Sequence, residues 1–401
     1  MKLLCRKLRR GRRPPAGRAS DAPAGREGGL FAEMRPCVWT LWAFQIWPLF
    51  EEDGRVVFRK RSLYFAYAVA SWTGTTYIAL RALIHWYSVI QSAGYFSLKA
   101  YYAWFFLVGH FSIAIPLLFW TNMRGVAEAF NYAQRFQVNF REVTGHRLSF
   151  GVAKKARVTA ALCPVVGLAF VLWSHDAGYV PWNQFPVYEM NATYLAILPE
   201  TWVLIALALE TAAQRLRAEL VQVLGDVGEA ADSGPRRRAL ADLRWLWMQL
   251  QHLVRMWSLT WTPCLAHLIL SSVTVLLLSV FGISLPLLRG QVIDDRLAGM
   301  MTAVVHNIYN INRVCSAGSR VRREVKDAFV KEMTRAKFAT ASTNLYPEVI
   351  ENKLKSESTS SHLCPPLFQL VKFLKAVDIQ DPCLDMGGFT SLNRALAVGV
   401  C

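Results

Sequence analysis

Five long runs of apolar residues, almost free of charge, constrain this chain more than any other feature. They occupy residues 64–84, 101–120, 156–173, 193–212 and 264–288. A helix that crosses a bilayer needs about 20 apolar residues, and these runs fit that length better than buried helices of a soluble protein do. Only 18% of the residues are charged, against roughly 25% in soluble domains. The pattern predicts an all-α, polytopic membrane protein, with a large all-α soluble protein as the alternative.

Two weaker runs extend this pattern toward the end of the chain. Residues 297–312 are apolar but carry Thr302, His306, Asn307 and Asn310. Polar groups in lipid need partners, so such a helix faces other helices or water, unless the run is an interfacial or re-entrant piece. Residues 387–401 read as the start of a further span that stops at Cys401. We therefore predict a seven-transmembrane helical bundle whose last helix is incomplete.

The placement of basic residues indicates which side of the membrane each loop occupies. A net charge of +17 suits a nucleic-acid partner, yet 40 of the 45 Lys and Arg residues lie in residues 1–63, 121–157, 213–262 and 313–386. If the N-terminus is cytoplasmic, all four segments lie on the cytoplasmic side, as the positive-inside rule requires. We expect a multi-pass plasma-membrane protein with a cytoplasmic N-terminus and no nucleic-acid partner.

The predicted organisation follows from these segments. Residues 1–36 are basic and rich in Pro and Gly, and we expect them to be disordered in the cytoplasm. Residues 37–314 form the membrane domain, with cytoplasmic helices at about 213–260, and 315–386 form a cytoplasmic helical region around a polar loop at 346–366. The cytoplasmic helices carry apolar stripes at helical spacing, so they pack on one another or lie on lipid headgroups.

Signals of catalysis are missing from the sequence. We find no metal-binding H-E-x-x-H, no phosphate-binding G-x-x-x-x-G-K-[ST] and no G-x-S-x-G nucleophile motif. The eight cysteines include no C-x-x-C pair and imply no disulfide framework. We expect a protein that is not an enzyme and that holds no cofactor or metal.

Three stretches resemble a known receptor family. They are "PLFEEDGRVVFRKRSLYFAYAV" at residues 48–69, "RVCSAGSRVRREV" at 313–325 and "VKFLKAVDIQDPCLDMGGFTSLNRALAVGVC" at 371–401. Together with the seven-span, N-inside pattern, they are similar to the insect-type gustatory receptors. The chain departs from that family in its Ser-rich loop at 346–366. It also lacks the family's last-span motif TYhhhhhQF, where h is apolar, which is expected shortly after Cys401.

The resemblance implies a function and an assembly. Such receptors are ligand-gated cation channels of four subunits, either identical or mixed with other gustatory receptor subunits, and they detect small-molecule tastants in a pocket between their spans. The alternatives are a G-protein-coupled receptor, which would place its N-terminus outside, and a transporter, which would show internal repeats.

Candidate ligand-binding residues follow from the depth at which the spans place them. They share an aromatic or polar side chain near the outer ends of the spans: Tyr101, Tyr102, Trp104, Trp173, Tyr194, Glu200, Trp202 and His306. The aromatic residues suit either a pocket or the aromatic belt of the membrane interface. Glu200 is an expensive charge within a span, and we expect it to pair with a cationic ligand or with Arg81. The sequon at Asn191 lies so close to the membrane that we expect it to stay unglycosylated.

Overall fold

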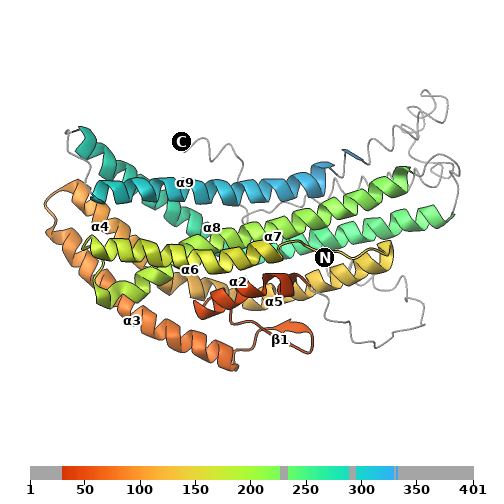
Figure 1. The fold of residues 1–401 in the computed structure, drawn as a ribbon, viewed down its shortest axis with the longest axis horizontal. Helices are drawn as coiled ribbons and strands as arrows, with labels where there is room; N and C mark the ends of the chain where they lie inside the picture. The colour runs from red at the N-terminus through yellow and green to blue at the C-terminus, as the bar shows by residue number, and fades with distance from the viewer. Residues whose placement is uncertain (1–28, 226–233, 289–294, 329–330, 333–401) are drawn as a thin grey trace, which may run out of the picture.

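The computed structural model describes residues 29–225, 234–288, 295–328 and 331–332. These residues form an elongated bundle of long helices, with a short helix and a β-hairpin beside it (Figure 1). The elements are α2 (Leu30–Ala43), β1 (Phe50–Glu52), β2 (Arg55–Val57), α3 (Leu63–Ser92), α4 (Phe96–Gly109), α5 (Phe111–Thr144), α6 (Ala153–Asp176), η1 (Trp182–Gln184), α7 (Phe185–Gly225), α8 (Gly234–Leu288), α9 (Asp295–Arg322) and the π-helical turn η3 (Arg323–Ala328).

The helices agree with the predicted all-α fold class in the part of the chain that the structure describes. Four helical stretches there are long and apolar enough to cross a membrane: Leu98–Thr144, Ala153–Asp176, Trp182–Leu224 and Arg238–Leu288. The predicted spans at 64–84 and 297–312 fall on α3 and α9, which are not among these four. The seven-span count therefore stays a prediction. The seventh segment, 387–401, and the loop 346–366 lie outside the described residues.

Helices α7 and α8 are longer than a bilayer is thick. They contain 41 and 55 residues, which at about 1.5 Å per residue is roughly 60 and 80 Å, against about 30 Å of hydrocarbon. The stripe on the early part of α8 is buried within the protein and consists of Leu240, Leu243, Leu246, Trp247, Leu250, Leu253 and Trp257. The stripe thus packs against other helices, with the Trp247 indole donating to the Val325 carbonyl of η3 at 3.1 Å.

Three predicted boundaries need correction. Residues 1–36 were assigned to a disordered segment, but α2 begins at Leu30, because apolar side chains at helical spacing bury one of its faces. The predicted span 101–120 is divided between α4 and α5 at His110, a few residues before Pro116, which has no N–H to bond the turn that precedes it. The predicted boundary between the membrane domain and the cytoplasmic helical region, at residues 314 and 315, falls inside α9, which runs unbroken from Asp295 to Arg322.

The β-hairpin fits a simple turn rule. Its strands pair antiparallel around Asp53 and Gly54, which have φ angles of 50° and 70°. Positive φ at both central residues is the geometry of a type I′ turn, for which Asp-Gly is a preferred pair. The side chain of Asn131 on α5 bonds both backbone groups of Val56 at 2.8 Å, which fixes the hairpin to the bundle.

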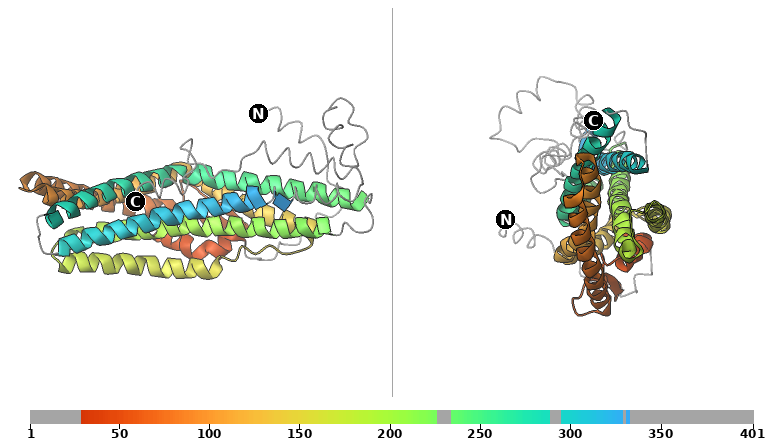
Figure 2. Two further views of the ribbon diagram at one scale, coloured as in Figure 1. Left: turned by 90° about the horizontal axis from the view of Figure 1, so that it is seen from above. Right: turned by 90° about the vertical axis from the view of Figure 1, so that its left-hand side faces the viewer.

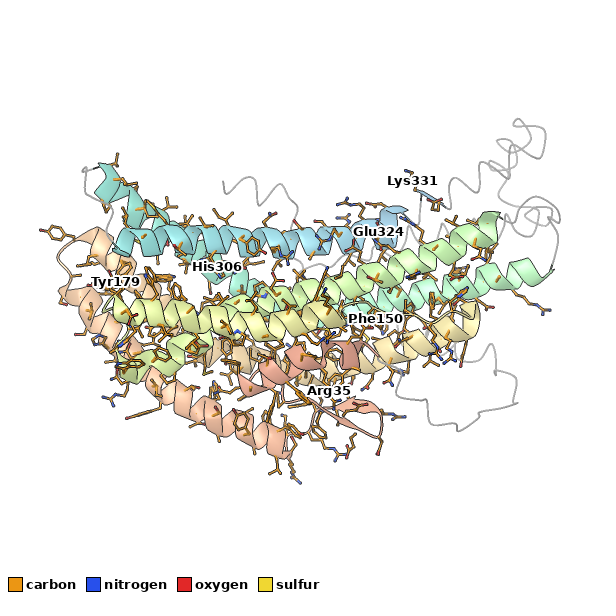
Figure 3. The ribbon with its side chains drawn as sticks, in the orientation of Figure 1. Arg35, Phe150, Tyr179, His306, Glu324 and Lys331 are labelled. Carbon is orange, nitrogen blue, oxygen red and sulfur yellow. The ribbon has the colours of Figure 1, made fainter. Side chains whose placement is uncertain are left out.

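Two hydrophobic clusters lie at different levels of the bundle. Figure 3 labels residues at its two ends: Tyr179 lies at the end where α6 leads into α7, and Glu324 lies toward the opposite end. At the level of the Tyr179 end, α4, α6, α7, α8 and α9 surround a cavity. α6 and α9 both pack on α7, and α9 also packs on α8 (Figure 2).

Candidate ligand-binding cavity

A cavity of about 180 Å³ lies between the helices toward the Tyr179 end. An apolar cavity of about 150 Å³ is large enough to hold benzene, so this one has room for a small organic molecule. It is lined by Trp104, Phe105, Val108, Phe111, Val166, Gly167, Phe170, Tyr188, Ala192, Leu195, Ala196, Ser271, Ser272, Val275, Thr302, Ala303, His306 and Asn307.

Aromatic rings build one side of the cavity. Trp104 packs edge-on against Phe105 and Phe170, at centroid distances of 4.9 and 6.0 Å, and Phe105 packs edge-on against Tyr188 at 5.7 Å. These edge-to-face contacts hold the rings against one another and tie α4 to α6 and α7.

Two glycines allow the helices around the cavity to approach closely. A Cβ atom on Gly167 of α6 would lie 2.7 Å from the Thr193 hydroxyl of α7, and one on Gly282 of α8 would lie 2.5 Å from the Met300 sulfur of α9. A larger residue at Gly167 would also press on the Thr193 backbone nitrogen at 3.0 Å, whereas at Gly282 the Met300 side chain would have to move aside.

The polar groups of the cavity come mainly from α8 and α9. They are Ser271, Ser272, Thr302, His306 and Asn307. The Thr302 hydroxyl donates to the Ala298 carbonyl at 2.9 Å, and the Asn307 amide donates to the Ala303 carbonyl at 2.8 Å. Among the described residues, no Asp, Glu, Lys or Arg lines the cavity, so it is suited to an uncharged occupant.

Two of the eight predicted site residues, Trp104 and His306, line the cavity. Tyr101 and Tyr102 pack next to it in the same hydrophobic cluster, where Tyr101 contacts Phe105 at a centroid distance of 5.3 Å. Trp173 lies on the surface of α6 with 40% of its side chain exposed, and its ring approaches the Gly299 position of α9. Of these five residues, only Trp104 and His306 line the cavity.

Tyr194, Glu200 and Trp202 belong to the other level of the bundle. The Tyr194 hydroxyl donates to the Phe44 carbonyl at 2.6 Å, and Trp202 packs against Trp261 at 5.8 Å. Glu200 accepts three hydrogen bonds from Arg313, at 2.8 to 3.2 Å, so its partner is Arg313 and not Arg81 as predicted. None of the three lines the cavity.

The sequon lies inside helix α7. Asn191 and Thr193 have no exposed surface, and the Thr193 hydroxyl donates to the Glu189 carboxylate at 3.2 Å. An enzyme that glycosylates asparagine could not reach this side chain in the folded protein.

Most cavity residues escaped the sequence analysis, because depth alone does not say which face of a helix points inward. Val108 and Phe111 follow Trp104 at helical spacing, as Ala192 and Leu195 follow Tyr188 on α7. Helical phase combined with depth would have brought Tyr188 and Ser272 into the prediction. Tyr188 was missed because it precedes the predicted span at 193–212, although α7 already begins at Phe185.

Three ion pairs join α7 to α9 and η3 on the Glu324 side of the cavity. Arg313 contacts Glu200 at 2.8 Å, Arg320 contacts Glu210 at 3.2 Å, and Arg217 contacts Glu324 at 3.0 Å. Asn310 lies between these pairs and the cavity, and its amide donates to the Leu195 carbonyl of α7 at 3.2 Å. The line of contacts fixes the register of α9 against α7.

The sequence of this chain is similar to that of a known chemosensory receptor. No family model matches the chain. The chain is similar to gustatory and odorant receptor 24 of Anopheles gambiae, with 22% identity over 296 residues. The aligned region covers 73% of this chain and 58% of that receptor, so the chain spans less than two thirds of its relative. The similarity supports a chemosensory receptor family and a multi-pass membrane protein, and the relative is a receptor and not an enzyme.

Proposed function

We propose that this protein is a gustatory chemoreceptor of the plasma membrane, a subunit of a ligand-gated cation channel that responds to a small-molecule tastant in the cavity. The observation that carries the proposal is the cavity without charged lining residues, which lies between helices long and apolar enough to cross a membrane. The similarity to an insect gustatory and odorant receptor supports it. Trp104 and His306 are its ligand contacts, from the α4 and α9 sides.

In the proposed topology the N-terminus is cytoplasmic and the Tyr179 end of the bundle faces outside. The excess of Lys and Arg in residues 1–63, 121–157, 213–262 and 313–386 supports this orientation. An epitope at the N-terminus should stay unlabelled on intact cells and become labelled after permeabilisation. Labelling of intact cells would instead favour the G-protein-coupled alternative.

Helix α9 is the proposed link between ligand binding and gating. Its first half contributes His306 and Asn307 to the cavity, and its second half carries Arg313 and Arg320, which pair with α7. A ligand that binds one arrangement of these helices better than another shifts the population toward that arrangement. Because the contacts are continuous along α9, a displacement at the cavity is passed toward the Glu324 end.

The proposed assembly is a homo- or hetero-tetramer with other gustatory receptor subunits, embedded in the lipid bilayer. The extensions of α7 and α8 beyond the bilayer supply a surface for it. Val221 and Trp245 on these extensions each leave 43% of their side chain exposed. Exposed apolar groups in a cytoplasmic region suit contact with a neighbouring subunit.

Ligand-evoked current in cells that express the full-length protein tests the proposal. At least one compound of a tastant panel should open a cation conductance, and Ala303→Phe should abolish the response by filling the cavity. Val305→Phe is the matched control, because Val305 lies on the same helix with 68% of its side chain exposed. A normally expressed protein that responds to no compound, or an Ala303→Phe variant that responds as the wild type does, would contradict the proposal.

A further inference from the structure

The hydrogen bonds of Asn310 determine which ring nitrogen of His306 carries a proton. The Asn310 nitrogen Nδ2 faces the Leu195 carbonyl at 3.2 Å, and a carbonyl oxygen can only accept, so this atom is the NH₂ group of the amide. The same Nδ2 lies 2.9 Å from Nε2 of His306. Since Nδ2 is a donor, Nε2 must be the unprotonated acceptor, and neutral His306 carries its proton on Nδ1.

His306 consequently offers the cavity a directed donor. Within the described part of the chain, Nδ1 of His306 has no hydrogen-bond partner, and the residue lines the cavity. Thr302 and Asn307 already donate to carbonyls of their own helix. The cavity is also lined by the rings of Trp104, Phe105 and Phe170, which suit an apolar body.

The size and polarity of the cavity exclude two classes of tastant. A sugar carries hydroxyl groups on all sides, and each buried one without a partner loses its hydrogen bonds to water, while most of the residues that line the cavity are apolar. A charged compound would lie beside no opposite charge among the described residues. A cavity of about 180 Å³ holds a molecule of about six to ten non-hydrogen atoms, by comparison with the benzene-sized cavity.

We propose that the ligand is a compact, uncharged, largely apolar molecule with one hydrogen-bond acceptor, such as a ketone, aldehyde or ester, and that the acceptor binds the Nδ1–H of His306. This inference rests on the proposed function and names its ligand class. Asn310 is the positioning residue, because it holds the tautomer of His306 from outside the cavity wall.

Three probes of the same size and shape separate the possibilities: acetophenone, α-methylstyrene, in which a methylene group replaces the carbonyl oxygen, and the 1-phenylethylammonium ion. Glucose is the fourth probe. Binding is measured on the purified full-length protein by ligand-induced thermal stabilisation. The wild type should bind acetophenone about tenfold more tightly than α-methylstyrene, as one hydrogen bond allows. It should not bind glucose or the ammonium ion measurably.

Two variants assign the preference to the imidazole. His306→Phe keeps an aromatic ring and removes the donor, so the tenfold ratio should fall to about one while α-methylstyrene still binds. Asn310→Leu leaves His306 free to adopt either tautomer, so the affinity ratio should fall although no cavity-lining residue has changed. If His306→Phe does not fold, Asn310→Leu alone tests the role of the imidazole. A ratio unchanged in both variants would overturn the inference.

Currents recorded with the same probes keep this inference separate from the proposed function. If acetophenone binds with the expected ratio but opens no conductance, the ligand class stands and the channel proposal fails. If glucose or the ammonium ion opens a conductance that Ala303→Phe abolishes, the receptor proposal stands and the ligand class is overturned.

Discussion

The two hydrophobic clusters of this bundle are built from the same residue types but differ in packing. Toward the Tyr179 end, Trp104, Phe105 and Tyr188 contact one another around an open cavity. At the other level lies a group that we call the tryptophan cluster, which consists of Trp47, Phe119, Phe130, Trp202, Trp257 and Trp261. Its rings meet at centroid distances of 4.9 to 6.0 Å, and none of its six members is more than 4% exposed.

This contrast indicates that the two levels of the bundle have different roles. An unfilled cavity forfeits packing energy, so its presence beside a dense cluster suggests that the open space serves a ligand. The two levels also differ in charge. No charged side chain among the described residues lines the cavity, whereas three ion pairs join α7 to α9 and η3 on the Glu324 side of it.

The largest expected effect comes from truncating one tryptophan at each level. Trp261→Ala should destabilise the protein by ~4 kcal/mol, because the side chain is fully buried and its neighbours cannot close the space. Trp104→Ala should cost ~2 kcal/mol, because this side chain already borders a cavity. Thermal unfolding in detergent measures both, with exposed Trp39→Ala as the control. Equal losses at Trp261 and Trp104 would remove the distinction between the two levels.

The second prediction concerns the ion pairs that hold α9 to α7. Glu210→Arg should destabilise the bundle by ~1 kcal/mol, since it sets Arg320 against a like charge at a partly buried position. Adding Arg320→Glu should restore most of the loss, because the reversed pair is attractive again. The control is the same exchange at Glu52 and Arg59, an exposed pair on the hairpin, where the unfolding temperature should barely change. If the double variant is as unstable as the single one, these two side chains stabilise the bundle through their packing and not through their charges.

Much of the helical architecture could be predicted from the sequence, because long apolar runs leave few alternatives. Each of the six predicted spans falls on described helices, and the apolar stripe from Leu240 to Trp257 is buried within the bundle, as one of the two readings expected. The start of α2 was missed because its buried residues follow directly on a basic, Pro/Gly-rich segment. The division of the second predicted span at His110 was missed because a run of apolar residues does not reveal where a helix is interrupted.

The candidate site was less predictable, since it depends on how helices turn relative to one another. Trp104 and His306 were found from depth and residue type, but Tyr194 and Trp202, which met the same criteria, belong to the other hydrophobic cluster. Nor does local sequence reveal that Glu200 meets Arg313, which is more than a hundred positions away. Pairings of this kind need the three-dimensional packing of α7 against α9.

The third prediction tests how α2 is attached to the level of the bundle that contains the tryptophan cluster. The Glu33 carboxylate accepts from the backbone N–H groups of Phe150 and Val152 at 3.1 and 2.8 Å, and from the Ser149 hydroxyl at 3.3 Å. Hydrogen bonds to a charged acceptor are stronger than neutral ones, so Glu33→Gln should cost ~1 kcal/mol and speed amide exchange at residues 149–152. Glu51→Gln on the exposed face of the hairpin is the matched control. Unchanged exchange in Glu33→Gln would mean that apolar contacts alone hold α2.

The smallest expected effect is a pH dependence on the α8 extension. His252 packs edge-on against Tyr132 at 4.9 Å, and burial, followed by the charges of Arg255 and Arg135, lowers the pKa of its imidazole below the usual value of 6.5. The unfolded chain therefore takes up this proton more readily than the folded one. The resulting stability is fully present above pH 6.5 and is lost as the pH falls through the lowered pKa of the folded protein.

His252→Gln should consequently reduce the difference in unfolding temperature between pH 7.5 and pH 5.5. These two pH values lie about one unit above and below the ordinary pKa of a histidine side chain. The narrowing should be slight, because the His252 side chain is mostly exposed and solvent screens the two arginines. His146→Gln is the control, because it removes an exposed histidine just after the end of α5. If wild type and His252→Gln lose the same stability in acid, the pH response of this level of the bundle arises from other groups.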